Sequence, residues 1–477
     1  MGISLCMIVK NEQDWIVKAV ESVRSIVDEV IIVDTGSTDS TPEQAEALGA
    51  KLLKSQWEDS FGQARNLSLA AAGEPWILVL DADERIAACD LQYIKEATET
   101  GSADGYHLIQ RNYVLKRQIL GWTPNTRRYQ EGDGYDGYVD NPLIRLFRNS
   151  PEIRFHGAVH EIIDPKRSPQ FKFGSIPAVI HHYGKVRGEE RVAAKQHLYL
   201  ALGLKKIEEE PANAKAYFDL GIQYQELGRH EEACACFDQS FEMTTLPISL
   251  LYQEISDKQL RQFDSALALL TRALRLGLNT FDVHLELGNV RLAQGHLLEA
   301  KGEYSASLKM RPNNPIAIYN HGLVLRKTGD VDGAQKFFER ALELDPTFRE
   351  PAVELAALRA QNQRYAEAID LLKPVVERNP DMREARLSLA KTYIQANEPD
   401  HALEILGAPP SEDAVALCLL GAAHLLKEDL DKAQKFLESA LRRDRSLVDA
   451  RINLAQIYAR KGDHARAARY MQAARTR

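Results

Sequence analysis

Acidic residues directly follow two apolar segments in the N-terminal part of the chain. Residues 30–33 (Val-Ile-Ile-Val) lead into Asp34, and residues 77–80 (Ile-Leu-Val-Leu) lead into Asp81-Ala82-Asp83. A carboxylate is costly to bury alone, so such acids are either solvated in a cleft or held by a cation or a donor. Two carboxylates one residue apart suit Mg²⁺ or Mn²⁺ and leave coordination positions for water and substrate phosphates. The Asp81 and Asp83 pair therefore predicts a divalent-metal site.

Other phosphate-binding patterns are missing from the sequence. It contains no GxxxxGK[ST] motif, and no GxGxxG follows the first apolar run, which excludes a P-loop site and argues against a dinucleotide oxidoreductase. Lys plus Arg total 60 and Asp plus Glu total 68, a net charge of −8. We therefore expect no nucleic-acid partner, because general binding to phosphate backbones needs an excess of positive charge.

A parallel sheet would bring these acids together. Apolar, β-branched runs at 3–9, 30–33 and 76–80 alternate with helical patterns at 13–25, 41–48 and 61–72. Such continuous runs are typical of strands buried on both faces, and the alternation predicts an α/β domain with a mainly parallel sheet. Ligands of open α/β sheets bind beyond the carboxyl ends of the strands, where the predicted acids lie.

From about residue 214 the sequence repeats with a period close to 34 residues. A small residue recurs at intervals of 33, 34, 34, 34, 34, 31 and 34, namely at Ala233, Ala266, Ala300, Ala334, Ala368, Ala402, Ala433 and Ala467. A second small residue stands twelve positions earlier in each unit except the second, which has Glu254. Two helices per unit pack closely at the small residues, and each unit buries its apolar face on the next. The pattern predicts an all-α solenoid of about eight units, with a shortened unit near residues 407–410 (Gly-Ala-Pro-Pro).

Motifs in both halves resemble known families. The segments 6–12, 28–41 and 81–84, together with Trp57, Phe61, Arg65 and Asn66, are similar to family 2 glycosyltransferases of the GT-A (Rossmann-like) fold over about residues 3–185. The later part resembles tetratricopeptide repeats, and the whole layout is similar to repeat-containing bacterial peptide and protein glycosyltransferases. We expect a GT-A domain over 1–187, a connecting helix over 188–213 and the repeats over 214–477.

The resemblance implies an inverting, metal-dependent transfer of a hexosyl or N-acetylhexosaminyl group from a nucleotide sugar, usually UDP-linked. Asp34 would bind the uracil or ribose of the donor, and Asp83, with Asp81, would hold the Mn²⁺ or Mg²⁺ that bridges the diphosphate. Positions with cleft-lining or donor-binding roles by resemblance are Lys10, Asn11, Glu12, Arg65, Asn66 and Ala82.

Inversion in one step needs a general base on the acceptor side. Glu161 is the leading candidate, because similar repeat-containing proteins carry Val-His-Glu at the place of residues 159–161, and Asp136 and Asp140 are its rivals. The same proteins carry a later His-Tyr-Gly, so His182 and His181 are candidate metal or diphosphate ligands. A hydrogen-bonded pair of core histidines is the alternative interpretation.

Residues 111–148 are rich in aromatic and basic side chains, with Tyr113, Trp122, Tyr129, Tyr135 and Tyr138 standing near glycines. Two interpretations fit this composition. One is a mobile lid whose rings stack on the acceptor. The other is a surface loop held by aromatic packing.

The acceptor stays open at this level. A peptide or protein side chain recruited by the repeats, and a cell-envelope or lipid-linked saccharide, both fit; so does a non-catalytic repeat scaffold with a degenerate transferase domain. The repeats could also form a homodimer. No apolar stretch of about 18 residues is present, so we expect no integral membrane contact. Five scattered cysteines fit a reduced, cytoplasmic location best.

Overall fold

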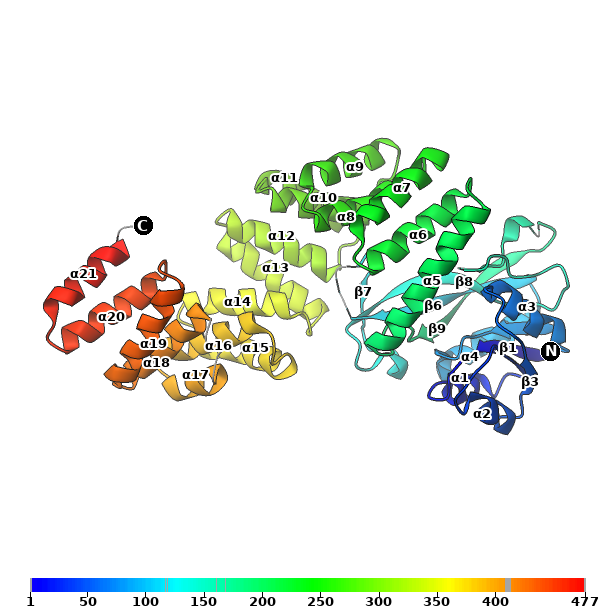
Figure 1. The fold of residues 1–477 in the computed structure, drawn as a ribbon, viewed down its shortest axis with the longest axis horizontal. Helices are drawn as coiled ribbons and strands as arrows, with labels where there is room; N and C mark the ends of the chain where they lie inside the picture. The colour runs from blue at the N-terminus through cyan, green and yellow to red at the C-terminus, as the bar shows by residue number, and fades with distance from the viewer. Residues whose placement is uncertain are drawn as a thin grey trace. The chain divides into compact units, whose positions relative to one another are not determined.

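The computed structural model describes residues 2–115, 117, 119–159, 161–167, 169–407 and 413–475. The chain forms two compact units, Met1–Met310 and Arg311–Arg477. The first contains the sheet domain and the first repeat helices, and the second contains repeat helices throughout (Figure 1).

The sheet begins with a parallel half built from the predicted apolar runs. Strand β1 (Ile3–Val9) pairs in parallel with β2 (Glu29–Asp34) on one side and with β4 (Trp76–Val79) on the other. Strand β3 (Lys51–Lys54) extends the sheet beyond β2, also in parallel. The register aligns Val9 with Asp34, so the carboxyl ends of β1 and β2 meet at one edge, as the sequence predicted.

The other half of the sheet is mixed. The strand order is β3-β2-β1-β4-β8-β6-β9-β5, and β7 pairs with β8. Strand β8 (Gly137–Arg148) runs antiparallel to β4 and to β6 (Gly105–Val114), whereas β9 (Phe173–His182) runs parallel to β6. The short strands are β5 (Glu84–Ile86), antiparallel to β9, and β7 (Thr123–Pro124). The prediction of an α/β domain with a mainly parallel sheet is confirmed, although the sheet is mixed because antiparallel pairs follow β4.

Helices cover both faces of the sheet. On one face, Leu5 and Met7 of β1 pack in a buried cluster with α1 (Ile16–Val23), α2 (Thr41–Ala47) and α4 (Leu91–Thr100). On the other face, Cys6 belongs to a second buried cluster with Leu69 of α3 (Phe61–Ala71). The alternation of Leu5, Cys6 and Met7 between two cores is the period of a strand buried on both sides.

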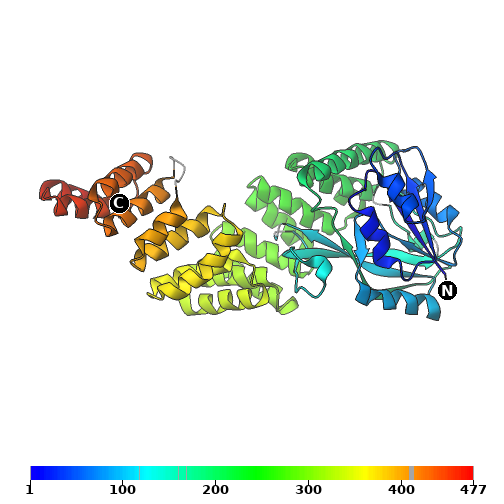
Figure 2. The same cartoon turned by 90° about the horizontal axis from the view of Figure 1, so that it is seen from below.

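Helix α5 (Glu189–Glu209) leaves the sheet domain and leads into paired antiparallel helices (Figures 1 and 2). The pairs of the first unit are α6 (Ala214–Glu226), α7 (His230–Thr244), α8 (Ile248–Gln259), α9 (Phe263–Arg275), α10 (Phe281–Ala293) and α11 (Leu297–Met310). Those of the second unit are α12 (Pro315–Lys327), α13 (Val331–Leu344), α14 (Arg349–Gln361), α15 (Tyr365–Arg378), α16 (Arg383–Gln395), α17 (Pro399–Leu406), α18 (Ala414–Leu426), α19 (Leu430–Arg443), α20 (Val448–Arg460) and α21 (His464–Arg475). The short α17 belongs to the unit with the 31-residue interval, and residues 408–410 of the Gly-Ala-Pro-Pro stretch lie outside the described residues.

Glycine is required where the two helices of a unit approach each other. A Cβ on Gly221 would lie 2.7 Å from the Phe237 ring, and a Cβ on Gly322 would lie 2.8 Å from the Phe338 ring. The first small residue therefore makes room for a ring of the second helix, sixteen positions later. No helix of the described residues is long and apolar enough to cross a membrane.

Candidate active site

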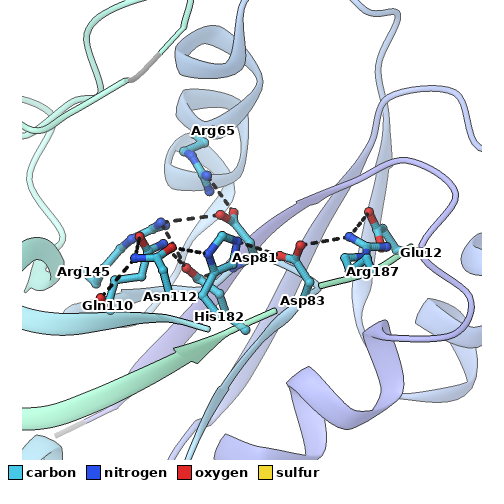
Figure 3. A network of polar contacts seen from close by, with 10 residues as sticks. Glu12, Arg65, Asp81, Asp83, Gln110, Asn112, Arg145, His182 and Arg187 are labelled. Atoms are coloured by element: carbon cyan, nitrogen blue, oxygen red, sulfur yellow. Dashed lines mark hydrogen bonds and ion pairs between the residues drawn. The ribbon is translucent and has the colours of Figure 1, made fainter. Parts of the chain in front are cut away.

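Asp81 lies just beyond β4 in a cluster of ion pairs (Figure 3). The Arg65 side chain, which projects from α3, places Nη2 2.6 Å from Asp81 Oδ1 and Nε 2.6 Å from Glu161 Oε1. Arg145 of β8 lies 3.5 Å from Asp81 Oδ2. Burial opposes ionisation of Asp81, but Arg65 and Arg145 outweigh it and hold the pKa of this carboxyl below its usual range. Because 25% of the Asp81 side chain is exposed, solvent reaches the cluster.

Glu161 is held in place by the segment around it. The Asn66 side chain donates from Nδ2 to the Phe155 carbonyl (3.0 Å) and accepts from the Phe155 N–H at Oδ1 (2.9 Å). A bridge between His156 and Ile162 then closes the loop that carries Glu161. Asn66 therefore fixes the backbone of the segment that carries Glu161, whereas Arg65, its neighbour in sequence, binds the Glu161 carboxylate directly. The central residue of the Val-His-Glu motif, His160, lies outside the described residues.

Asp83 is buried between a histidine and an arginine. Arg187 Nη1 donates to Asp83 Oδ2 at 2.9 Å, and His182 Nε2 lies 3.6 Å from Asp83 Oδ1. His182 Nδ1 lies 2.6 Å from Asn112 Oδ1, and the Asn112 amide nitrogen donates elsewhere, so Oδ1 is the acceptor. The Nδ1–H of His182 therefore donates to Asn112, and Nε2 faces Asp83. Burial raises the pKa of Asp83, but His182, Lys195 and Arg187 together lower it.

The arrangement around Asp83 fits a divalent ion in part. A Cβ on Gly184 would lie 2.6 Å from His182 Nε2 and 3.3 Å from Asp83 Oδ2, so the glycine keeps the space beside both groups open. A carboxylate oxygen and an imidazole nitrogen fixed by a second hydrogen bond are suitable ligands. Among the described residues no group of three or more His, Cys, Asp or Glu side chains converges on one point. The remaining ligands would have to be water and substrate oxygens, as Mg²⁺ sites commonly have.

His181 faces the opposite side of β9 from His182, because successive strand residues alternate. It is fully buried, and its Nδ1 lies 2.7 Å from the hydroxyl of Tyr113. Burial lowers the pKa of His181 to about 3, with smaller contributions from Arg111 and Arg85. His181 is thus a neutral core residue, as the alternative interpretation of the two histidines has it, and the structure does not bring this candidate ligand to Asp83.

The two rival base candidates lie apart from this cluster. Asp140 stands opposite Arg111 in the β6–β8 register and accepts from it at 2.9 and 2.8 Å. Asp140 therefore lies on the same face of the sheet as His181, because Arg111 also stands opposite His181 in the β6–β9 register. Asp136 is 48% exposed and forms an ion pair of 3.0 Å with Arg117. Of the three predicted bases, the structure brings only Glu161 to Asp81.

The aromatic residues of the 111–148 segment are mostly buried. Tyr113, Trp122, Tyr129 and Tyr138 belong to the core. Tyr113 stacks on Tyr135, with ring centroids 4.7 Å apart, and a Cβ on Gly137 would lie 2.3 Å from the Trp122 ring. These rings hold the hairpin together, which favours aromatic packing over a lid whose rings contact an acceptor.

The ends of β1 and β2 form a second group of predicted residues. Asp34 is buried and accepts from Ser37 at both Oγ (2.5 Å) and N (3.1 Å). Asn11 Oδ1 accepts from the Thr38 N–H at 2.7 Å, which ties the two strand ends together. Lys10 is exposed at the end of β1, and Ala82 is buried between the two acids of the Asp-x-Asp motif. Glu12 belongs to the Asp83 group, because Arg187 binds both carboxylates.

Sequence reasoning missed the roles of Arg187 and Arg145. Arg145 interrupts the apolar end of β8 and pairs with Asp81 and with the fully buried Glu84, at 3.4 Å. A charged residue within a buried strand was the available signal. Arg187 stands in the turn between β9 and α5, where its sequence context gives no sign of its partners.

Comparison with known families decides the nature of the sheet domain. Residues 4–150 match the family described as glycosyl transferase family 2, and tetratricopeptide repeat families match residues 202–235, 256–347, 325–417 and 418–477. The chain carries a family 2 glycosyltransferase domain followed by tetratricopeptide repeats. This confirms the resemblance that the motifs indicated.

Curated relatives each match part of this chain. A TPR repeat-containing protein of Synechococcus elongatus is 39% identical over 190 residues, or 38% of this chain and 42% of the relative. The SPbeta prophage-derived glycosyltransferase SunS of Bacillus subtilis is 25% identical over 284 residues, or 59% of this chain and 60% of the relative. An uncharacterized glycosyltransferase of Rickettsia felis is 45% identical over 136 residues, or 27% and 48%. The chain thus matches between two fifths and three fifths of the length of these relatives.

Proposed function

We propose that this protein is an inverting, metal-dependent glycosyltransferase that moves a sugar from a nucleotide donor, most simply UDP-linked, to an acceptor bound with help from the repeats. The observation that carries the proposal is the convergence of Asp81, Asp83 and His182 with Arg65 and Glu161 at the end of β4. The family 2 match over residues 4–150, which include Arg65, Asp81 and Asp83, supports the donor class.

Each side chain of the cluster has a role in this reaction. Bound Mn²⁺ or Mg²⁺, held by Asp83 and His182 with Asp81 nearby, supplies the charge neutralisation that a leaving diphosphate needs. Asp34 and Asn11, at the joined ends of β1 and β2, bind the nucleoside. Arg65 fixes the Glu161 carboxylate by binding Oε1, so that Oε2 accepts the proton of the acceptor nucleophile.

We assign residues 1–187 to the transferase, 188–213 to the connecting helix and 214–477 to the repeats. The acceptor is proposed to be a peptide or protein side chain, because tetratricopeptide repeats are built to present a surface to other polypeptides. A homodimer through the repeats, and a cytoplasmic location inferred from the scarce cysteines, complete the proposal.

The donor and metal assignments are tested with the full chain, Mn²⁺ and a panel of UDP-sugars, by measuring UDP release. We expect metal-dependent release that Asp83→Asn reduces at least a hundredfold, in line with the loss of a metal ligand. Release from no UDP-sugar would overturn the proposal in favour of a non-catalytic scaffold. Undiminished release by Asp83→Asn would remove the metal assignment.

The base assignment needs a matched pair of acids. Glu161→Gln is expected to lower turnover by about 10²- to 10⁴-fold, the usual contribution of a general base, and to leave UDP binding unchanged. Glu152→Gln, at an exposed residue nearby, should keep the wild-type rate. If Glu161→Gln turns over normally while Asp136→Asn or Asp140→Asn does not, the general base is Asp136 or Asp140 instead.

The acceptor class is read from where labelled sugar goes in a cell lysate supplied with the full chain and the accepted donor. Label in protein that protease releases supports the peptide or protein acceptor. Label confined to organic-extractable material would replace it with a lipid-linked saccharide.

A further inference from the structure

The segment between the sheet and the repeats brings two cations to the acids of the active site. It lies outside both family matches, because the transferase match ends at residue 150 and the first repeat match begins at 202. Its first cation is Arg187. Nη1 donates to Asp83 Oδ2 at 2.9 Å and to Glu12 Oε1 at 3.0 Å, and Nη2 also pairs with Glu12 (Figure 3).

Arg187 is held, but it is not fully satisfied. Its guanidinium lies 5.1 Å from the centroid of Trp15, and its buried Nε has no hydrogen-bond partner among the described residues. Arginine forms paired hydrogen bonds most readily with carboxylates and phosphates. The unused donor therefore leaves Arg187 with capacity for a second anion.

Lys195 is the second cation and stands two turns into α5. Its side chain is exposed, yet the nearby carboxylates of Asp83 and Asp81, together with Tyr199, outweigh the effect of surrounding protein and raise its pKa. The ammonium lies 5.6 Å from the Tyr199 ring, and that ring contacts Phe61 edge-on at 5.6 Å. Phe61 is the first residue of α3, the helix that carries Arg65, so Lys195 lies near the side of α5 that contacts the start of α3.

The first repeat holds α5 in this position. Leu200 and Ile207 of α5 pack in one apolar cluster with Leu220 of α6 and Phe237 of α7. A Cβ on Gly203 would lie 3.2 Å from Leu220, so the two helices are closely apposed. The position of Lys195 thus depends on helices that belong to the repeat array.

From these contacts we propose that Arg187 and Lys195 bind the diphosphate of the nucleotide donor, and that Arg187 exchanges Asp83 for a phosphate oxygen when the donor and its metal arrive. The inference rests on the proposed function. Arg65 and Arg145 are already tied to Asp81, Glu161 and Glu84 inside the cluster. Arg187 instead occupies the oxygen of Asp83 that lies beside Gly184, where a metal would compete with it.

The exchange predicts opposite effects of one substitution on two ligands. Arg187→Gln frees Asp83, so Mn²⁺ alone should bind several-fold more tightly in a titration followed by Mn²⁺ electron paramagnetic resonance. The same variant should bind UDP with Mn²⁺ about tenfold or more weakly by calorimetry, the loss of a charge-assisted contact. A merely structural Arg187 would weaken both; equal or weaker Mn²⁺ binding by the folded variant overturns the exchange.

Lys195→Met tests the second cation, with Lys205→Met on the same exposed helix as control, since Lys205 pairs with Asp59 at 3.5 Å. We expect Lys195→Met to weaken UDP about tenfold while uridine binds as to wild type, and Lys205→Met to change neither. Equal loss for uridine and UDP, or no loss, overturns the role of Lys195. Arg187→Lys keeps the charge and should retain part of the UDP affinity; none retained would contradict phosphate binding. If wild type binds no nucleoside diphosphate at all, the proposed function fails first, which separates the two outcomes.

Discussion

Asp81 in the transferase domain and Glu254 in the repeats have pKa values that are shifted in opposite directions. Asp81 lies beside two arginines, and its pKa is lowered although burial acts against ionisation. Glu254 of α8 is fully buried, and the Lys258 ammonium 3.2 Å away is shared with Glu286. Burial and Glu286 raise the pKa of Glu254 to about 8. The comparison shows that neighbouring cations can outweigh the effect of burial, as at Asp81, or fail to do so, as at Glu254.

The group formed by Glu254, Lys258 and Glu286 lies where the pattern of small residues in the repeats is interrupted. Glu254 occupies the position that is glycine in neighbouring units, and the residue sixteen places later is Leu270 instead of the Phe or Tyr found in those units. The smaller partner leaves room for the longer side chain. Glu254 thus fits sterically, but too little positive charge lies near it to stabilise its ionised form.

The largest effect is expected from removing the cation that serves two acids of the active site. Arg65→Met leaves Asp81 and Glu161 without their shared partner, and it should lower the free energy of unfolding of the transferase domain by about 3–5 kcal/mol. Urea unfolding followed by hydrogen exchange in β4 and α3 measures it. Arg167→Met, whose side chain is 64% exposed, is the control. A similar loss of unfolding free energy in Arg65→Met and Arg167→Met would mean that the ion pairs of Arg65 stabilise the domain no more than an exposed ion pair does.

A glycine of the regular repeats gives an intermediate effect. Gly322→Ala places a Cβ against Phe338, and overpacking of this kind costs about 1–3 kcal/mol. Hydrogen exchange in α12 and α13 should rise accordingly. Phe338→Leu in the same chain recreates the smaller partner seen opposite Glu254, and it should recover much of the loss. If the double variant is no more stable than Gly322→Ala, volume matching does not explain the pattern.

A third effect concerns pH. The folded-state pKa of Glu254 lies above its ordinary value, so its protonation stabilises the fold fully below about pH 4.5, and this contribution is lost as the pH rises to about 8. Local stability of α8 should therefore decline over this range. Glu254→Gln keeps the neutral shape and should remove most of the decline. Hydrogen exchange in α8 at pH 5 and pH 8 checks this; parallel curves for both chains would contradict a charged Glu254 in the fold.

The fold was largely predictable because it depends on local patterns. Apolar runs identified β1, β2 and β4, and the 34-residue period identified the repeats, since both signals are written into consecutive residues. The later strands β6, β8 and β9 were not predicted. Their sequences mix charged and aromatic residues, and their pairing depends on contacts across tens of residues.

The site was predictable only for residues that belong to motifs. The Asp-x-Asp pair and Asp34 could be located because each ends an apolar run. The side of the sheet on which a side chain lies could not be predicted. His181 and His182 are adjacent in sequence, yet their side chains lie on opposite faces of β9. Arg187 could not be found either, because its contacts to Glu12 and Asp83 depend on how the chain turns after the sheet.

The boundary between the two compact units falls after Met310, within the array of helical pairs. This has a practical consequence for anyone who shortens the gene. A fragment ending near residue 187 would leave out α5 and would remove Tyr199 from its edge-on contact with Phe61 of α3. A fragment ending at residue 310 keeps α5 together with α6 and α7, which pack on it, within one compact unit, and we expect this fragment to fold on its own.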